Sequence, residues 1–364
     1  MRYCALQELQ PAMVLGRAIY GFRGDLLLAR GKELDHYFIS RLGELGFPGV
    51  YVEEAGFEEV DPPEIIDGSL RASTEVLLDE CLETLTKIAP SSQQFSGSLS
   101  ESLNSHPELK KAIPIGKVRN TVKQIVQELL DQFATQLPCL LLKAQSRYQV
   151  QHAMDSMLVA TLLGINFRFI YRELHQLALA TLLHDVGKTV LATENEPNIG
   201  PDHPKYKEHP TVGGLLVLHS GDDFYTECAA IQQHHEKQDG SGFPYGLKSE
   251  GKSPVKGRAY STGSIYRLAE IVSVADMYDV LTSGTYQPPL SPEQAIEQLI
   301  NRTPSEFNPH VVKMLASVIQ ILPVGCQVRI KKSSDSHLRY SRGVISKVNP
   351  NSPHKADLIL THDP

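Results

Sequence analysis

The sequence has few cysteines, and their spacing carries no pattern. Five are scattered along 364 residues without a C-x-x-C pair: Cys4, Cys81, Cys139, Cys228 and Cys326. Disulfide frameworks belong to small secreted domains with closely spaced cysteines, and a chain of this length does not need them. We therefore expect reduced, buried thiols and a cytoplasmic protein.

Long apolar runs and a surplus of basic residues are also missing. The longest apolar runs, such as Cys139–Leu142, are far shorter than the roughly 20 residues of a membrane-spanning helix. The N-terminus shows no secretory pattern, so we expect a soluble protein without membrane insertion. The 35 Lys and Arg against 42 Asp and Glu give a net charge of −7. This balance argues against binding of long nucleic-acid duplexes, but not of a small phosphorylated ligand held by local cations.

The hydropathy pattern predicts a mainly α fold in four regions. In order they are a small α/β N-terminal region, a helical linker or regulatory region, a large helical domain and a small β appendage, at residues 1–60, 61–145, 146–322 and 323–364. Outside the large domain, helical spacing of apolar residues is clearest at Leu34–Leu45, Ser69–Ala89 and Val118–Phe133. Short strands are predicted near the C-terminus, at Gln327–Lys331, Gly343–Val348 and Asp357–Leu360.

The large helical domain is rich in histidine. Eight of the 14 histidines lie between residues 152 and 235. A single histidine on a helix is more often a hydrogen-bonded core or surface residue than a ligand. The set differs because most of its members stand beside acidic residues or other histidines.

The pair His184-Asp185 follows the apolar run Ala178–Leu183. Desolvating a carboxylate and an imidazole there is costly without a compensating cation, and a metal supplies one. Lys188 lies four residues after His184, so on a continuing helix it shares that face and could meet a phosphate oxygen or protonate a leaving group. An exposed charge after Gly187 is the alternative.

The same reasoning applies to further positions along the domain. Asp276 follows the apolar run Ile271–Ala275, as Asp185 follows its own run. His209 precedes a proline, and His234-His235 place two imidazoles on a predicted helix. The candidate metal ligands are therefore His152, His184, Asp185, His209, His234, His235 and Asp276.

These motifs together resemble the HD superfamily of metal-dependent phosphohydrolases, and within it the HD-GYP subfamily. They are, in chain order, His152, Leu182–Lys188 (Leu-Leu-His-Asp-Val-Gly-Lys), His209-Pro210, His234–Pro244 (His-His-Glu-Lys-Gln-Asp-Gly-Ser-Gly-Phe-Pro), Ala275–Ser283 and Phe307–Val312. The resemblance covers about residues 148–320. The first 140 residues resemble only the variable N-terminal regions of such proteins.

The resemblance implies a helical domain with two divalent metals, usually iron or manganese. His184, Asp185 and Asp276 would hold the first metal with His152 nearby, and Asp185 would bridge to a second metal held by His209, His234 and His235. A hydroxide bridging the metals would attack phosphorus. The catalytic residues would be Asp185 and Lys188. The substrate would be cyclic di-GMP, hydrolysed to pGpG or to GMP in bacterial second-messenger signalling.

Four departures from the family pattern concern the substrate and a third metal. Tyr148 stands where some relatives have a Glu that binds a third metal, so we expect a two-metal site. Phe243 replaces the motif's Tyr, and the segment from Ser283 to Tyr286 lacks the family's Arg. Lys248–Tyr266 is longer than usual, and its cations could replace that Arg; a solvated surface insertion is the alternative. The predicted substrate contacts are Lys188, Asp239, Gly242, Phe243, Tyr286, Lys252, Lys256 and Arg258.

Two other readings stay open. A sensor or interaction protein could bind metal and nucleotide but turn over slowly, and an HD hydrolase could act on cyclic GMP-AMP or a linear nucleotide. Domain order alone suggests a regulatory or dimer-forming role for the N-terminal region. The helices at 69–89 and 118–145 could form a homodimer, and a signalling protein could be a partner.

Overall fold

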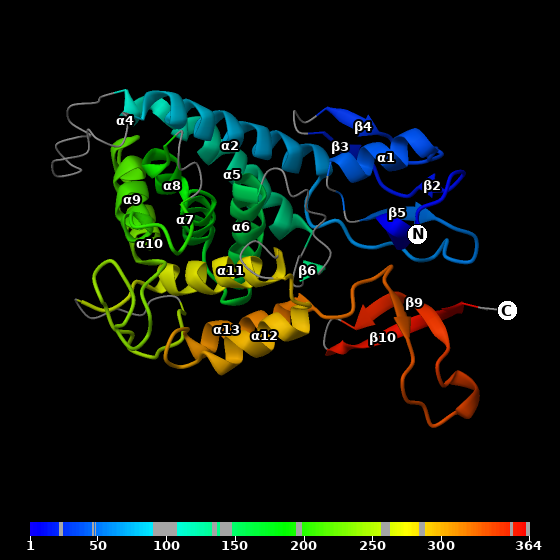
Figure 1. The fold of residues 1–364 in the computed structure, drawn as a ribbon. Helices are drawn as coiled ribbons and strands as arrows, with labels where there is room; N and C mark the ends of the chain where they lie inside the picture. Colours follow the sequence, from blue (N-terminus) through cyan, green and yellow to red (C-terminus); the bar gives the residue numbers. More distant parts are fainter. Residues whose placement is uncertain are drawn as a thin grey trace. The chain divides into compact units, whose positions relative to one another are not determined.

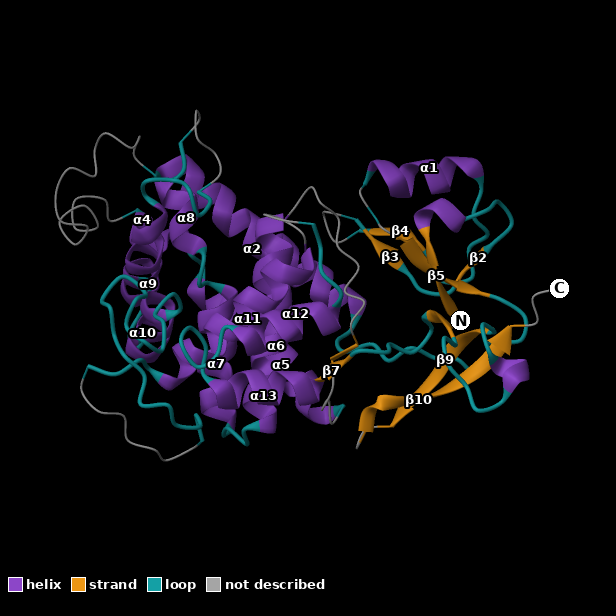
Figure 2. Ribbon diagram, turned by 60° about the horizontal axis from the view of Figure 1, so that its bottom comes forward, coloured by secondary structure: helices purple, strands orange, loops and turns teal. Residues whose placement is uncertain are grey.

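The computed structural model describes residues 1–361 except 22–24, 46, 48, 90–107, 133–136, 139–147, 194–198, 256–262, 284–287 and 350–351. The chain forms two compact units. The first comprises Met1–Ser73, Ala134–Tyr148 and Ser317–Pro364, and the second comprises Thr74–Phe133 and Gln149–Ala316. Helices predominate (Figure 2), which confirms the predicted mainly α class. One unit contains both ends of the chain, which the hydropathy pattern assigns to separate regions.

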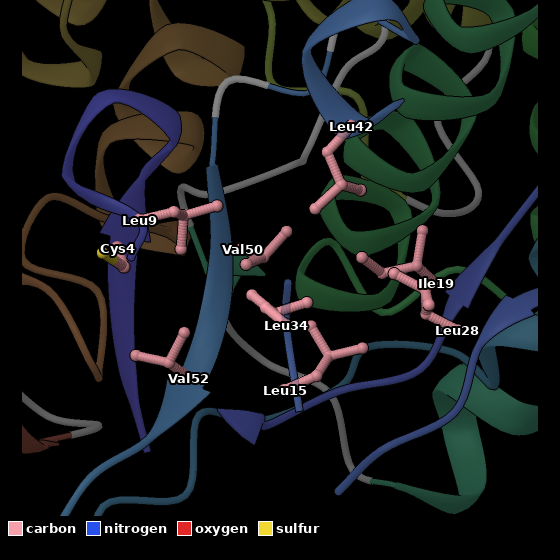
Figure 3. Packing of buried hydrophobic residues seen from close by; sticks show 9 residues of the cluster. All are labelled: Cys4, Leu9, Leu15, Ile19, Leu28, Leu34, Leu42, Val50 and Val52. Atoms are coloured by element: carbon pink, nitrogen blue, oxygen red, sulfur yellow. The ribbon is translucent and has the colours of Figure 1, made fainter. Parts of the chain in front are cut away.

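The N-terminal part of the first unit is built on a three-stranded antiparallel sheet in the order β1-β5-β2. Its strands are Arg2–Ala5 (β1), Val14–Leu15 (β2) and Gly49–Glu53 (β5), and β3 (Ile19–Tyr20) pairs with β4 (Leu26–Leu28). Helix α1 (His36–Glu44) is capped by Asp35, whose side chain accepts from the Phe38 N–H. Figure 3 shows the apolar side chains between these elements: Cys4, Leu9, Leu15, Ile19, Leu28, Leu34, Leu42, Val50 and Val52.

The C-terminal strands form a second antiparallel sheet in the order β10-β9-β8. They are Gln327–Arg329 (β8), Arg342–Asn349 (β9) and Ser352–Thr361 (β10), close to the predicted positions. Val344 and Ile345 of β9 pack with Phe57 and Val60 from the N-terminal part of this unit. In the same unit, β6 (Leu137–Pro138) pairs in parallel with β7 (Ile319–Gln320).

The second unit is helical (Figure 1). It contains all or most of each of the following helices: α2 (Gly68–Ile88), α4 (Leu109–Ala112), α5 (Ile115–Asp131), α6 (Tyr148–Asn166), α7 (Tyr171–Leu182), α8 (Val186–Leu191), α9 (His209–His219), α10 (Tyr225–Gln233), α11 (Arg267–Ser283), α12 (Pro292–Asn301) and α13 (Pro309–Val318). Helix α7 contacts α5, α10 and α11, and α9 lies between α8 and α10. No helix among the described residues is both long enough and apolar enough to span a membrane.

Two helices show why this unit folds as it does. Helix α5 buries one stripe, Val118, Val122, Ile125, Val126 and Leu129, as its spacing predicts. Helix α6 is buried on all sides from Val150 to Gly164. A helix surrounded by others cannot present polar groups to water, so a polar residue on it must find partners inside the protein. His152 is such a residue.

Candidate metal centre

Three side chains from three segments form what we call the first ligand group: His152, His184 and Asp276. The Nε2 atom of His152 lies 3.2 Å from His184 Nε2 and 3.2 Å from Asp276 Oδ1. All three residues are buried. Asp276 follows its apolar run without a break in the helix, unlike Asp185, because α11 continues to Ser283. The carboxylate projects from the middle of a helix whose next turn carries Asp279.

His209, His234 and His235 form the second ligand group. His209 is the first residue of α9, while His234 and His235 follow the end of α10 rather than lying within it. The Nε2 atoms of His209 and His234 are 3.4 Å apart. Because α9 packs against α10, a helix start and a helix end meet at this group.

Asp185 lies between the two groups. Its Oδ1 atom is 3.2 Å from His209 Nε2 and 3.6 Å from His184 Nε2, and its Oδ2 atom is 3.7 Å from His152 Nε2. Asp185 Oδ1 is buried without a hydrogen-bond partner among the described residues. A buried carboxylate oxygen without a donor is costly, and it indicates a cation as the missing partner.

Lys188 also contacts Asp185, but Lys188 and His184 do not lie on one face of a continuous helix as predicted. Helix α7 ends at Leu182 and α8 begins at Val186, so His184 and Lys188 do not share one continuous helix. The break turns the backbone between them, and Lys188 Nζ lies 2.5 Å from Asp185 Oδ2. Lys188 is therefore beside the centre through its contact with Asp185.

Gly187 allows this close arrangement. A β-carbon on Gly187 would lie 2.1 Å from the His209 carbonyl oxygen and 2.7 Å from the Gly213 nitrogen. Only glycine permits two backbones to approach so closely. The contact between α8 and α9 places His184-Asp185 beside His209.

Backbone contacts orient the imidazoles. The Nδ1 atoms of His184, His209 and His234 lie 2.7, 2.5 and 2.6 Å from the carbonyl oxygens of residues 181, 206 and 231. A carbonyl oxygen only accepts, so each Nδ1 carries the proton and donates it. In a neutral ring this leaves a lone pair on each Nε2.

The inward-facing lone pairs are the structural evidence that the site fits metal ions. The Nε2 atoms of His209 and His234 are two acceptor nitrogens that face each other at 3.4 Å, and they cannot hydrogen-bond to each other without an added proton. A metal between them accepts both lone pairs, and a partner that fixes the other ring nitrogen is typical of metal-bound histidines. The donor set of imidazoles and carboxylates suits divalent first-row metals.

The pKa shifts of the second group agree with this reading. Burial lowers the pKa of His209 below its ordinary value. Burial, with the nearby His184 and His209, lowers the pKa of His234 to about 3. Burial and His234 hold the pKa of His235 well below the usual range. Metal ligands must be unprotonated, and these imidazoles are neutral at physiological pH.

The pKa values of the two acidic residues in the centre are also lowered, which favours their charged form. Burial opposes ionisation of Asp185, but the Lys188 ammonium outweighs it and holds the pKa well below its usual range. The pKa of Asp276 is likewise held well below its usual range, against burial, by the neighbouring His152 and His184. Burial lowers the pKa of His152, yet its bonds to Asp276 and Asp279 prevail and raise it to about 10.

Asp279 is a candidate functional residue that the sequence analysis did not single out. Its Oδ2 atom accepts from His152 Nδ1 at 2.8 Å, and both residues are buried. It lies one helical turn after Asp276 on α11, so a second acid at that spacing was the available signal. Carboxylates that hold a metal-bound histidine in this way fix its orientation and raise its basicity.

Replacing Asp279 by Asn tests this contact. We expect the affinity for one metal ion to fall about 10- to 100-fold, because the charge that supports His152 is lost while the side chain keeps its shape. Isothermal titration of the metal-free protein with Mn²⁺ measures the effect, and circular dichroism checks that the fold is kept. Unchanged affinity in a folded variant would show that Asp279 does not support the site.

The loop after α10 folds back over the second group. The Phe243 ring stacks on the His235 ring, with centroids 4.7 Å apart. Glu236, also missed from the sequence, accepts from the backbone N–H groups of Tyr245 and Leu247 and so closes the loop. A β-carbon on Gly242 would lie 2.5 Å from the His235 carbonyl oxygen, so glycine is required where the loop meets its own start.

The other predicted substrate contacts have no described link to the centre. Asp239 is exposed on the loop and accepts from the Ser241 N–H, and Lys252 pairs with Glu250. The remaining three, Lys256, Arg258 and Tyr286, lie outside the described residues.

Comparison with known proteins gives the class of domain. Residues 150–281 match the family model of the HD domain. This range contains every candidate ligand and confirms the predicted resemblance to the HD superfamily.

Two relatives are cyclic di-GMP phosphodiesterases. One, from Pseudomonas aeruginosa, is 25% identical over 226 residues, which make up 61% of this chain and 51% of the relative. The response regulator RpfG of Xanthomonas campestris is 31% identical over 170 residues, 43% of this chain and 39% of the relative. The chain thus spans about half or less of the length of these relatives.

A third relative has a different named substrate. It is a 3′3′-cGAMP-specific phosphodiesterase of Vibrio cholerae, 26% identical over 211 residues, which are 54% of this chain and 35% of the relative. A solved structure, an HDG"Y"P protein of Bdellovibrio bacteriovorus, matches with 15% identity and a TM-score of 0.44, and the match covers 86% of this chain and 97% of that chain.

Proposed function

We propose that this protein is a metal-dependent phosphodiesterase that hydrolyses cyclic di-GMP to pGpG or GMP in bacterial signalling. The observation that carries the proposal is the position of Asp185 between two groups of inward-facing imidazoles. A carboxylate that lies near the imidazoles of both groups suits a pair of metals. The relatives named as cyclic di-GMP phosphodiesterases support the choice of substrate.

In this proposal the first ligand group and the second ligand group each hold one divalent ion, and Asp185 is shared between them. Iron and manganese are the proposed metals, because mixed imidazole and carboxylate donors suit both. When bound, the two ions lower the pKa of a water molecule and neutralise charge on the phosphoryl oxygens.

The chain's own residues supply the rest of the chemistry. Lys188 stands at the edge of the centre with its ammonium on Asp185, where it can bind a phosphate oxygen or give a proton to the leaving oxygen. Phe243 offers an apolar ring face beside His235 for a nucleobase. Asp279 holds His152 in the orientation that leaves Nε2 directed inward.

The proposal is tested with anaerobically prepared protein loaded with Fe²⁺ or Mn²⁺. Cyclic di-GMP, cyclic GMP-AMP and linear pGpG are incubated separately, and products are separated by chromatography. We expect turnover of cyclic di-GMP that is lost on chelation and restored by metal. Tight binding of cyclic di-GMP without turnover of any substrate would replace the enzyme with a sensor.

The second candidate function is hydrolysis of another nucleotide, with cyclic GMP-AMP first. The Vibrio cholerae relative with that specificity favours it. A higher kcat/KM for cyclic GMP-AMP, or for the linear dinucleotide, would establish it in the same assay.

We also propose a cytoplasmic homodimer with a signalling-protein partner. Cys4, Cys81, Cys228 and Cys326 are free thiols, which fits a reducing compartment. The dimer and the partner rest on domain order alone. Light scattering after size exclusion measures the oligomeric state, and a monomer at micromolar concentration would refute the dimer.

A further inference from the structure

Tyr206, which no sequence motif singles out, contacts several residues of the candidate metal centre. It opens a 3-10 turn, Tyr206–Glu208, directly before α9. Its carbonyl oxygen accepts from His209 Nδ1, and its ring lies 5.0 Å from the His209 ring and 5.9 Å from the Phe243 ring. The Lys188 ammonium is 5.3 Å from the ring centroid. Tyr206 therefore contacts residues of the second group, the loop and the catalytic lysine.

The phenol oxygen has the contact of greatest consequence. It lies 3.2 Å from His235 Nε2, and the ring is half-buried. The ring contacts alone could be made by phenylalanine. The hydroxyl adds an oxygen donor beside a nitrogen of the second ligand group.

The spacing of these two atoms matches that of two ligands on one metal. Metal–nitrogen and metal–oxygen bonds of about 2.0–2.2 Å, at tetrahedral or octahedral angles, place neighbouring donor atoms about 2.8–3.6 Å apart. The His209 and His234 Nε2 atoms of the same group are 3.4 Å apart. In four histidines of the centre a carboxylate or carbonyl oxygen holds Nδ1, which leaves Nε2 for a metal: His152, His184, His209 and His234. The Tyr206 oxygen lies beside the same ring nitrogen, Nε2, of His235.

We propose that the Tyr206 phenol oxygen is a further ligand of the metal held by the second ligand group. Coordination replaces the phenol proton, which leaves to solvent, with an oxygen–metal bond, as tyrosine does on iron elsewhere. Tyr206 would then fill a coordination position beside His209, His234 and His235. The inference rests on the proposed ligand role of the second group, but not on the identity of the substrate.

The experiment compares Tyr206→Phe with a matched control, Tyr225→Phe. Tyr225 lies in the same unit and is 72% exposed. Each metal-free protein is loaded anaerobically with Fe²⁺, oxidised with ferricyanide and examined by visible absorption and resonance Raman spectroscopy. Ferric iron bound to phenolate gives a charge-transfer band with tyrosine ring vibrations. We expect this band in the wild type and in Tyr225→Phe, and its loss in Tyr206→Phe.

A second measurement follows metal binding itself. Titration with Mn²⁺ is expected to show that Tyr206→Phe binds one of two ions at least about 10-fold more weakly, the size typical of altered metal sites. A wild type with two bound irons and no phenolate band, or a Tyr206→Phe variant that keeps the band, overturns the ligand role of Tyr206 while the proposed function stands. A wild type that binds no metal refutes the proposed function and this inference with it.

Discussion

Asp185→Asn is expected to leave a folded protein that no longer retains two metal ions and has almost no phosphodiesterase activity. The amide has the size of the carboxylate and can still accept from Lys188, so the local structure should persist. It lacks the charge and the second oxygen that Asp185 directs toward His209 and His152. Metal ions contribute several kcal/mol to stabilising a phosphoryl transition state, so kcat should fall about 10³-fold or more, at 1.36 kcal/mol per factor of ten.

Metal analysis by plasma mass spectrometry and the cyclic di-GMP assay measure this prediction. Asp222→Asn is the matched control, because it removes an exposed acid from the same unit and should change neither quantity. Two tightly bound ions in Asp185→Asn, with activity close to that of the wild type, would mean that the catalytic centre lies elsewhere.

Gly187→Ala is expected to disrupt the centre although alanine offers no ligand and removes none. Its β-carbon would lie 2.1 Å from the His209 carbonyl oxygen, and a backbone atom cannot rotate away as a side chain can. Helices α8 and α9 would have to separate, which moves His209 away from Asp185. Overpacking of this kind costs about 1–3 kcal/mol, and a backbone clash falls at the upper end.

Calorimetry and Mn²⁺ titration test this change together, with Gly116→Ala as the control. Gly116 lies in α5, and no atom is within 4 Å of a β-carbon added there. Alanine is the better helix former, so the control should keep or slightly raise the melting temperature. If Gly187→Ala melts at the wild-type temperature and binds metal normally, the contact between α8 and α9 does not hold the centre together.

The class of chemistry was predictable from local sequence. His184-Asp185 after an apolar run, the His234-His235 pair and Asp276 are residue types that bind metals, and their order along the chain matched one superfamily. The helices outside the large domain were predictable as well, because a stripe such as that of α5 follows from side-chain spacing alone. The spacing of apolar residues also predicted α1, α2 and the C-terminal strands to within a few residues of their observed bounds.

Contacts between distant segments were not predictable in this way. The position of Lys188 depends on a break between α7 and α8, which the apolar run before it does not reveal. The support of His152 by Asp279 joins residues 127 positions apart, and the pairing of β1 with β5 joins the chain start to Gly49–Glu53. Such contacts depend on packing, to which many distant residues contribute at once.

The sequence by itself therefore determined which side chains could bind metal and that they belong to a helical domain. Only the tertiary structure decided that these side chains form two groups with Asp185 between them, and that the Tyr206 hydroxyl lies beside His235. The physical reason is the approach of α8 to α9 at Gly187 and of α9 to α10. Local residue preferences specify the helices. The distance between two packed helices is set by the size of the residues at their contact, because protein interiors are close-packed.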